Sequence, residues 1–300
     1  MVPDWETNAV FFAASLPRVL PGLWHRLAAA LARNGVEPRP VEDTKDIWVR
    51  DFLPVQATPG RFVKFRYDPD YLRGYGHRRT GAEICEHLSF LGNLQHSPLR
   101  LDGGNVVASR QVVILTDKAY SENRTWSRRA FRAALRATLG AERCLVIPAE
   151  PGDCFGHADG VVRFFDERSV VVNDHSVQDP SYGRQLRGIL TRAGLRVEVL
   201  PYRPDTSVND GVPSAIGNYL NFLQVGSLVL APAYGRAEDE SARHRLESLL
   251  PEARVISIPC SELAARGGVL HCASWTVRLR RAHRYYLKTK PPPTRGGVRA

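Results

Sequence analysis

Five amphipathic stretches recur along the chain, each with apolar residues three or four positions apart, the spacing of one buried helix face. They occupy residues 18–34, 80–91, 125–139, 182–193 and 238–250. Most end at a glycine or proline, and a short apolar run typical of a strand follows. The clearest such runs are PRPVE, CLVIPA, RVEVLP and RVISIP, and the run near SPLRL is the weakest. The pattern predicts a repeated helix-and-strand unit.

Pairs of strand-forming runs predict hairpins at 105–116, 161–173 and 222–232, and residues 47–67 form a looser fourth pair. The fifth unit has one such run, SWTVRLRR, whereas the chain opens with an unpaired run, NAVFFAAS. We expect these first and last strands to pair and to close a ring.

Five units of helix, strand, polar loop and hairpin predict a cyclic repeat in which every polar loop opens toward one central site. The alternative is a doubly wound α/β sheet. Its crossover helices would join parallel strands, whereas the strands of a hairpin are antiparallel, so the pattern favours the ring.

The positive charge is concentrated at the end of the chain. The 41 Lys and Arg exceed the 31 Asp and Glu by ten, which alone would indicate a nucleic-acid partner. Residues 276–300, however, hold eight Arg and Lys and no acid, which leaves about +2 for residues 1–275. The basic end could bind nucleic acid or another acidic surface. We favour a solvated, flexible tail at 281–300, because PPPTRGG is typical of disorder.

The five cysteines, an odd number without a CxxC pair, argue against a disulfide framework and against a zinc finger or ribbon. A reducing compartment fits this composition, so we expect a cytoplasmic protein. The early apolar stretch AVFFAAS is too short to span a membrane, and Asp4 and Glu6 precede it where a signal peptide would carry basic residues. We therefore expect no signal peptide and no anchor.

The polar segments between the strands hold the reactive and charged side chains. They lie at 44–51, 101–105, 152–160, 205–218 and 266–275. Together they supply a thiol, an imidazole and several carboxylates, the groups of a covalent acid/base mechanism. If HAD is extended, His157 and Asp159 point the same way, whereas the neighbours His271 and Cys272 point oppositely. His157 is therefore the better base for Cys272.

Each candidate also has a plainer interpretation. Cys272 could be a small buried hydrophobe, and the HAD motif could bind a metal with help from Asp174 and His175. Asp102, in LDGG, could belong to an ordinary turn, and Asp51, in WVRD, could lie at the solvated edge of a strand. Because all these residues fall at equivalent positions of a repeated unit, we favour a catalytic site.

Six motifs form a specific set: DIWVRD, LDGGN, LTDKAYSENR, GHADGVVRF, YLNFLQVG and GGVLHC. With them the chain resembles the agmatine deiminase and bacterial-type peptidylarginine deiminase group of the guanidine-modifying (pentein) superfamily, over roughly residues 5–280. The resemblance implies an α/β fold, a five-bladed α/β propeller, with a single catalytic domain at 1–280.

The resemblance also assigns roles. It implies that Cys272 is the nucleophile and that His157 is the general acid/base. Asp51 and Asp159 would grip the guanidinium, whose planar N–H edges suit bidentate carboxylates. No metal and no organic cofactor is implied.

Three further residues are candidates for the substrate-binding wall: Trp48 in DIWVRD, Asp102 in LDGGN and Asn218 in IGNY. Asp102 departs from the pattern, because many relatives carry Glu at this position. The shorter side chain retracts the carboxylate by one methylene, about 1.5 Å, and its contact with the substrate stays open at this stage.

The predicted reaction is hydrolysis of a guanidinium group to a ureido product and ammonia through a thiouronium on Cys272. Agmatine or a related small guanidine is the expected substrate, with arginyl peptide as the second choice. An amidinotransferase, which passes the amidino group to an amine, is the alternative within the superfamily. A homo-oligomer is compatible with the sequence, and no membrane or nucleic-acid partner is expected.

Overall fold

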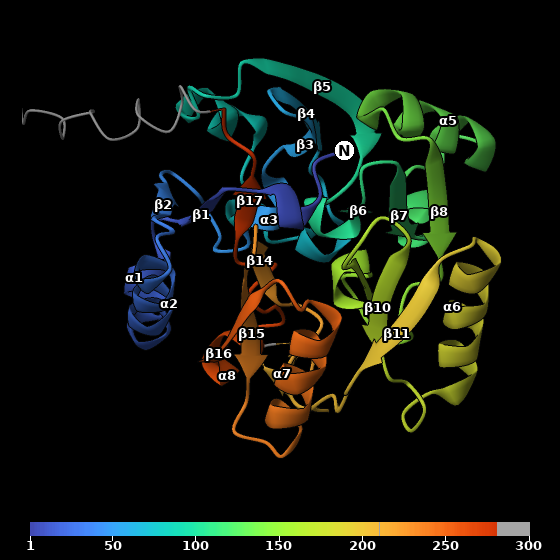
Figure 1. Cartoon of the computed structure of the whole chain (residues 1–300). Helices are drawn as coiled ribbons and strands as arrows, with labels where there is room; N and C mark the ends of the chain where they lie inside the picture. Colours follow the sequence, from blue (N-terminus) through green and yellow to red (C-terminus); the bar gives the residue numbers. More distant parts are fainter. Residues whose placement is uncertain (210, 281–300) are drawn as a thin grey trace, which may run out of the picture.

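The computed structural model describes residues 1–209 and 211–280, and the repeated unit is visible in its sheets (Figure 1). Five separate three-stranded sheets occur in this part of the chain, and in each the central strand has one antiparallel and one parallel neighbour. In spatial order they are β17 (Trp275–Val277), β1 (Ala9–Ala13) and β2 (Pro38–Val41); β3 (Val55–Thr58), β4 (Arg61–Arg66) and β5 (Asn93–Arg100); β6 (Val107–Ala108), β7 (Val112–Thr116) and β8 (Arg143–Ile147); β9 (Val162–Phe164), β10 (Ser169–Asn173) and β11 (Arg196–Leu200); and β14 (Leu223–Val225), β15 (Leu228–Ala233) and β16 (Arg254–Pro259).

The first and last strands pair, which confirms that prediction. In the antiparallel β1–β17 pair, Ala9 lies opposite Val277 and Phe11 opposite Trp275. Over the described residues the sheets stay separate, so they form neither one doubly wound sheet nor one closed sheet. A two-stranded pair, β12 (Val208–Asn209) with β13 (Val212–Pro213), lies within the fourth polar segment.

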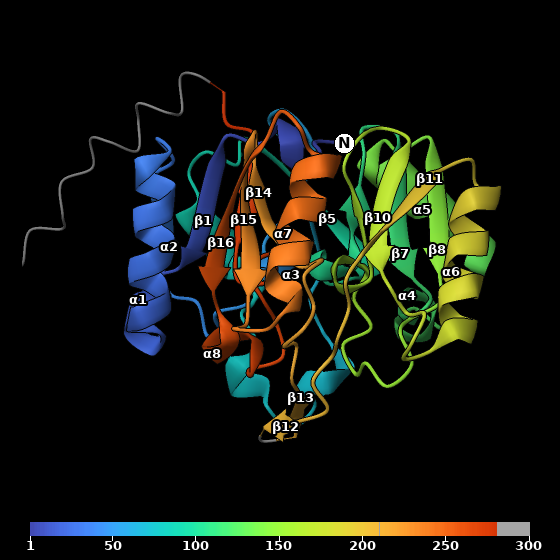
Figure 2. The same cartoon turned by 60° about the horizontal axis from the view of Figure 1, so that its bottom comes forward.

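Four long helices lie at the periphery of the sheets (Figure 1 and Figure 2): α2 (Pro21–Arg33), α5 (Arg128–Leu139), α6 (Pro180–Arg192) and α7 (Glu238–Leu249). Short helical turns complete the set: α1 (Leu16–Val19), α3 (Val49–Phe52), α4 (Lys118–Glu122) and α8 (Ser261–Ala264). Helix α5 shows how the sequence sets the ends: the Ser127 side chain accepts a hydrogen bond from the Ala130 amide, and Gly140 ends the helix with a φ of 70°. In the described part of the chain, no helix has the length and apolar character needed to cross a membrane.

The second unit departs from the predicted helix over 80–91. A 3-10 helix forms there over Ala82–His87, and the following strand starts at Asn93, earlier than the SPLRL run indicated. Within this segment the buried residues are Ile84 and Cys85, too few to make the apolar face of an α-helix.

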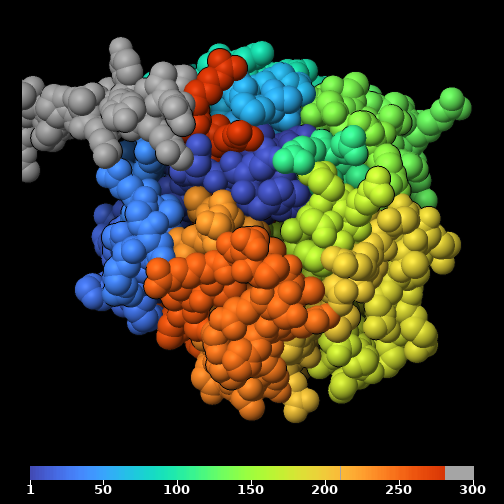
Figure 3. Space-filling view, in the orientation of Figure 1, coloured from blue at the N-terminus to red at the C-terminus, as the bar shows by residue number. Residues whose placement is uncertain are grey.

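The first residues of the chain are enclosed by later parts of it. In the space-filling view of Figure 3, the dark-blue N-terminal segment lies at the centre of one face, between surfaces from several units. Asp4–Glu6 form a single 3-10 turn there. The Thr276 hydroxyl, on β17, donates a hydrogen bond to the Asp4 carboxylate at 3.2 Å. The turn is therefore attached to β17, the last strand of the described residues.

Candidate active site

Polar segments from four of the five units line a cavity of about 1000 Å³. Six of the predicted site residues lie on its wall: Trp48, Asp51, His157, Asp159, Asn218 and Cys272. Asp102 is the exception. It does not line this cavity, and its carboxylate contacts His157 Nε2, so its contact with the substrate, which the sequence left open, stays a prediction.

Asp51 reaches the cavity from a helical turn rather than from a strand edge. Residues Val49–Phe52 form α3, and Asp51 is buried, so the interpretation of WVRD as a solvated strand is wrong. The amide of Gly104 donates to Asp51 Oδ1 at 3.2 Å. A Cβ at Gly104 would lie 2.6 Å from that oxygen and 2.7 Å from His157 Nδ1. The glycine of LDGGN is therefore what lets these two side chains approach each other.

His157 lies between two carboxylates. Its Nε2 is 3.0 Å from Asp102 Oδ2, and its Nδ1 is 3.5 Å from Asp51 Oδ1. The Tyr71 hydroxyl donates to the same Asp102 oxygen at 2.9 Å. Burial opposes protonation of the imidazole, but Asp51 and Asp102 outweigh it and raise the pKa of His157. Burial also raises the pKa of Asp51. The geometry suits a histidine that is charged when it meets the substrate.

Asp159 is a buried carboxylate with two different oxygens. Its Oδ2 is 2.6 Å from His271 Nδ1 and 3.6 Å from Cys272 Sγ, whereas its Oδ1 is buried without a hydrogen-bond partner. Burial alone would raise the pKa of Asp159, but the hydrogen bond from His271 helps to hold that pKa below its usual value. An unpaired anionic oxygen costs free energy in the folded protein unless a ligand supplies a donor.

Cys272 lies in a turn made possible by the preceding glycines. A Cβ at Gly268 would come within 2.6 Å of the Trp48 ring, so only glycine lets the two segments pack this closely. The Cys272 amide donates to Asn221 Oδ1 at 3.2 Å, and Asn221 Nδ2 lies 3.2 Å from Sγ. Burial raises the pKa of the Cys272 thiol, and the charge of Asp159 adds to this effect. A bound cation would lower it again.

Sequence reasoning missed Asn221 and chose Asn218 instead. Asn218 lines the cavity, but its Nδ2 donates to Gly160 O at 3.0 Å and its Oδ1 accepts from the Leu220 amide, so its side chain holds the backbone. Asn221 holds Cys272 directly. The available signal was its position at the start of NFLQVG, inside one of the six motifs.

Alternation along an extended segment accounts only partly for the shared direction of His157 and Asp159. His157 has extended backbone, but Ala158–Gly160 form a 3-10 turn, so alternation along a strand does not explain why both side chains face the cavity. The opposite directions of His271 and Cys272 hold, since Cys272 lines this cavity and His271 lines another. No group of three or more His, Cys, Asp or Glu in the described part of the chain could hold a metal ion.

A second polar cluster lies on the wall of the same cavity. The Tyr202 hydroxyl donates to Glu150 Oε1 at 2.6 Å, and His175 Nδ1 is 3.9 Å from that oxygen. His175 is 3% exposed, and its Nε2 has no hydrogen-bond partner. Burial raises the pKa of Glu150 to about 7. Two residues of the cavity wall, Asp159 and His175, thus each have a buried polar atom without a hydrogen-bond partner among the described residues.

Comparison with known proteins identifies the family. The sequence model of one protein family, the Porphyromonas-type peptidyl-arginine deiminases, matches residues 25–277. The chain belongs to this deiminase family. One relative is the agmatine deiminase of Stutzerimonas stutzeri (strain A1501). Its sequence is 25% identical to this chain, and the alignment covers 82% of this chain and 78% of that protein.

Solved structures related to the family share the fold. The agmatine deiminase of Enterococcus faecalis superposes with a TM-score of 0.77 at 18% identity, over 93% of this chain and 96% of that one. A putative arginine deiminase from Porphyromonas gingivalis gives 0.74 at 22% identity, over 92% and 97%. An amidinotransferase from Microseira wollei gives 0.62 at 14% identity, over 93% and 97%. These neighbours place the chain in the α/β pentein fold.

Proposed function

We propose that this protein is a guanidine deiminase that converts the guanidinium group of a small cationic substrate to a ureido group and ammonia. Membership of a deiminase family makes it a hydrolase of the guanidino C–N bond. The observation that carries the proposal is the unpaired Asp159 Oδ1, buried beside the Cys272 thiol.

We also propose that the five sheets form the five blades of a propeller around this site.

The planar guanidinium would lie between the carboxylates of Asp51 and Asp159, which accept its N–H groups in pairs. Its charge stabilises the Cys272 thiolate, which offsets the burial of the thiol. The thiolate then adds to the guanidinium carbon. His157 donates its proton to the departing nitrogen, which leaves as ammonia, and a cationic thiouronium stays bound to the sulfur.

The second half of the reaction uses the now neutral His157. The imidazole takes a proton from water, and the hydroxide adds to the thiouronium carbon. Collapse of this adduct breaks the C–S bond, expels the Cys272 thiolate and releases the ureido product as the hydroxyl proton passes to solvent. Asp102 accepts a hydrogen bond from His157 Nε2 throughout and keeps Nδ1 facing Asp51. No other group is needed to balance the reaction.

The charges on the cavity wall favour a substrate with a second cationic group. Among the described residues, seven carboxylates line it: Asp46, Asp51, Glu150, Asp153, Asp159, Asp179 and Asp205. Two arginines, Arg78 and Arg266, also line it, and both are exposed. An agmatine-like amine suits this surface better than the α-carboxylate of free arginine. Assays of agmatine, arginine, methylated arginines and an arginyl peptide for ureido product and ammonia test the proposal.

Glu150→Gln should raise KM for agmatine about tenfold and leave kcat nearly unchanged, because it removes a charged acceptor for the distal ammonium. Steady-state kinetics with agmatine and with butylguanidine, which lacks the amine, provide the comparison. Butylguanidine should show no such difference between the two proteins. An equal rise in KM for both substrates would show that Glu150 does not bind the amine.

The pH profile of kcat/KM should have two displaced limbs. Because burial raises the pKa of Asp51, whose anion holds the substrate, the acid limb should lie above the ordinary aspartate value of about 4. Because Asp51 and Asp102 raise the pKa of His157, whose proton goes to the leaving nitrogen, activity should persist above the ordinary histidine value of about 6.5. Rates in buffers spanning roughly pH 4 to 11 measure both limbs. Limbs at the two ordinary values would contradict this assignment.

Hydrolysis is distinguished from the amidinotransferase alternative by its products. Ammonia and a ureido product in equal amounts support the deiminase, whereas transfer of the amidino group to an added amine supports the alternative. The expected flexible tail and its alternative, nucleic-acid binding by the basic end, both concern residues 281–300, which lie outside the described residues.

A further inference from the structure

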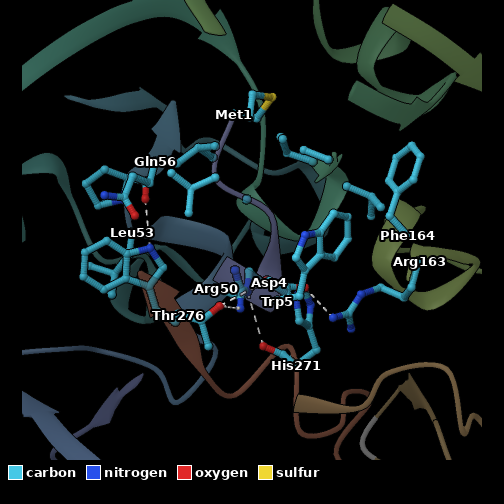
Figure 4. A pocket seen from close by; sticks show the side chains of 18 residues that line it. Met1, Asp4, Trp5, Arg50, Leu53, Gln56, Arg163, Phe164, His271 and Thr276 are labelled. Atoms are coloured by element: carbon cyan, nitrogen blue, oxygen red, sulfur yellow. Dashed lines mark hydrogen bonds and ion pairs between the residues drawn. The ribbon is translucent and has the colours of Figure 1, made fainter. Parts of the chain in front are cut away.

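A second, smaller cavity lies behind the catalytic one and contains a buried cluster of charges (Figure 4). Its volume is about 50 Å³, and Asp4, Arg50, Arg163 and His271 line it. None of these residues lines the large cavity that holds Cys272. Figure 4 shows them converging from the N-terminal turn, from α3, from β9 and from the turn before β17. The cluster is therefore separate from the substrate, and only His271 reaches through to Asp159.

His271 fixes the orientation of Asp159. Its Nδ1 lies 2.6 Å from Asp159 Oδ2, and both side chains are almost completely buried. Burial lowers the pKa of His271, and Arg163 and Arg50 lower it further, which favours the neutral ring. A neutral imidazole that faces a carboxylate with Nδ1 carries its single proton there. This hydrogen bond engages Oδ2 and leaves Oδ1 as the free oxygen.

Asp4 balances the charge behind that hydrogen bond. Its Oδ2 lies 2.5 Å from Arg163 Nη2 and 3.7 Å from His271 Nε2. Arg50 Nη2 donates to Thr276 Oγ1 at 3.2 Å, and the same hydroxyl donates to Asp4. With His271 neutral, the cations of Arg50 and Arg163 match the anions of Asp4 and Asp159. Loss of the Asp4 charge would leave Arg163 buried without its partner, which is costly.

We propose that His271 and Asp4 are positioning residues of the active site, with His271 holding Asp159 Oδ2 so that Oδ1 faces the guanidinium, and Asp4 keeping the cluster behind it neutral. Because it assumes that a guanidinium group binds at Asp159, this inference rests on the proposed function. Neither residue touches the substrate. Instead, they fix the orientation of the Asp159 carboxylate and keep it negatively charged.

The test compares His271→Leu with His271→Asn. Asparagine places an amide N–H close to the position of Nδ1 and can still donate to Asp159, whereas leucine cannot. We expect His271→Leu to lower kcat/KM for agmatine about 10- to 100-fold, the scale of a lost hydrogen bond to a charged group. His271→Asn should stay within about threefold of the unsubstituted protein. Thermal unfolding of both variants shows whether each is folded.

A second readout does not depend on turnover. Without the His271 hydrogen bond, Asp159 should be protonated more easily and should repel the Cys272 thiolate less. The pH midpoint of Cys272 alkylation by iodoacetamide, located by peptide mass spectrometry, should therefore fall in folded His271→Leu and stay unchanged in His271→Asn. Equal midpoints in the two variants would overturn the proposal. Absence of ureido product from the unsubstituted protein would instead refute the proposed function, while the midpoints would still report on Asp159.

Asp4 is tested against its neighbour in the same turn. Asp4→Asn should lower kcat/KM about tenfold, as expected for the loss of a half-buried, hydrogen-bonded charge, and Asp4→Glu should restore part of it. Glu6→Gln removes an equal charge from the same turn, but Glu6 pairs with Arg110 and Arg278 and not with His271 or Arg163, so it should leave kcat/KM unchanged. Equal losses in Asp4→Asn and Glu6→Gln would mean that Asp4 only anchors the turn, and would overturn its role.

Discussion

Cys272→Ala should abolish formation of the ureido product, with a fall in kcat of at least about 10⁴-fold, the scale on which loss of a covalent nucleophile acts. The thiol lies 3.6 Å from Asp159 Oδ2 and is held by Asn221, so the variant removes the attacking atom and leaves the carboxylates that bind the substrate. Binding of agmatine, measured by calorimetry, should survive. Turnover would be followed by coupled ammonia release and by a colorimetric ureido assay.

Cys154→Ala is the matched control for this result. Cys154 is an exposed cysteine on the wall of the same cavity, so its replacement tests whether any thiol near the substrate suffices. We expect wild-type kcat. Substantial activity in Cys272→Ala, or an equal loss in Cys154→Ala, would falsify the assignment of the nucleophile.

His157→Gln should lower kcat about 10²- to 10⁴-fold, because the same imidazole serves as acid in the first half of the reaction and as base in the second. Glutamine keeps a polar side chain between Asp51 and Asp102 but cannot carry the proton. Both halves of the reaction should slow, and the hydrolytic half should slow more because water is left without a base, so that the thiouronium accumulates. Mass spectrometry of the intact protein after incubation with agmatine should detect Cys272 carrying the N-alkylamidino group, which has the mass of agmatine less ammonia.

The control for His157 is His96→Gln, on the exposed side of β5, which should turn over normally. If His157→Gln kept the kcat of the unsubstituted protein, another group would have to supply the proton. If kcat fell only in parallel with the melting temperature, the imidazole would be structural.

Much of the fold could be predicted from periodicity alone. The long helices α2, α5, α6 and α7 and the hairpins after them arise from local patterns, so residue spacing specifies them. The segment Ala82–His87 could not be predicted as a 3-10 helix, because its few apolar residues fit either a short helical face or a loop. The pairing of β1 with β17 was inferred only because each lacked a local partner.

The site was harder to predict in its detail than in its chemistry. The types of the reacting residues, Cys272 and His157, follow from what a guanidinium reaction needs and from the motif set. The placement of Asp102 behind His157, and of Asn221 against Cys272, depends on contacts between residues about fifty positions apart. Such contacts have no signature within a local window of sequence.

The β1–β17 pair has a consequence for synthesis of the protein. Ala9 pairs with Val277, and Asp4 lies 3.7 Å from His271, so residues near 4–9 and near 271–277 contribute to one small volume. During translation His157 and Asp159 emerge more than a hundred residues before Cys272, and the reactive thiol is the last of the three to leave the ribosome. We therefore expect activity to appear only after β1 has paired with β17, a contact between residues far apart in sequence that forms slowly.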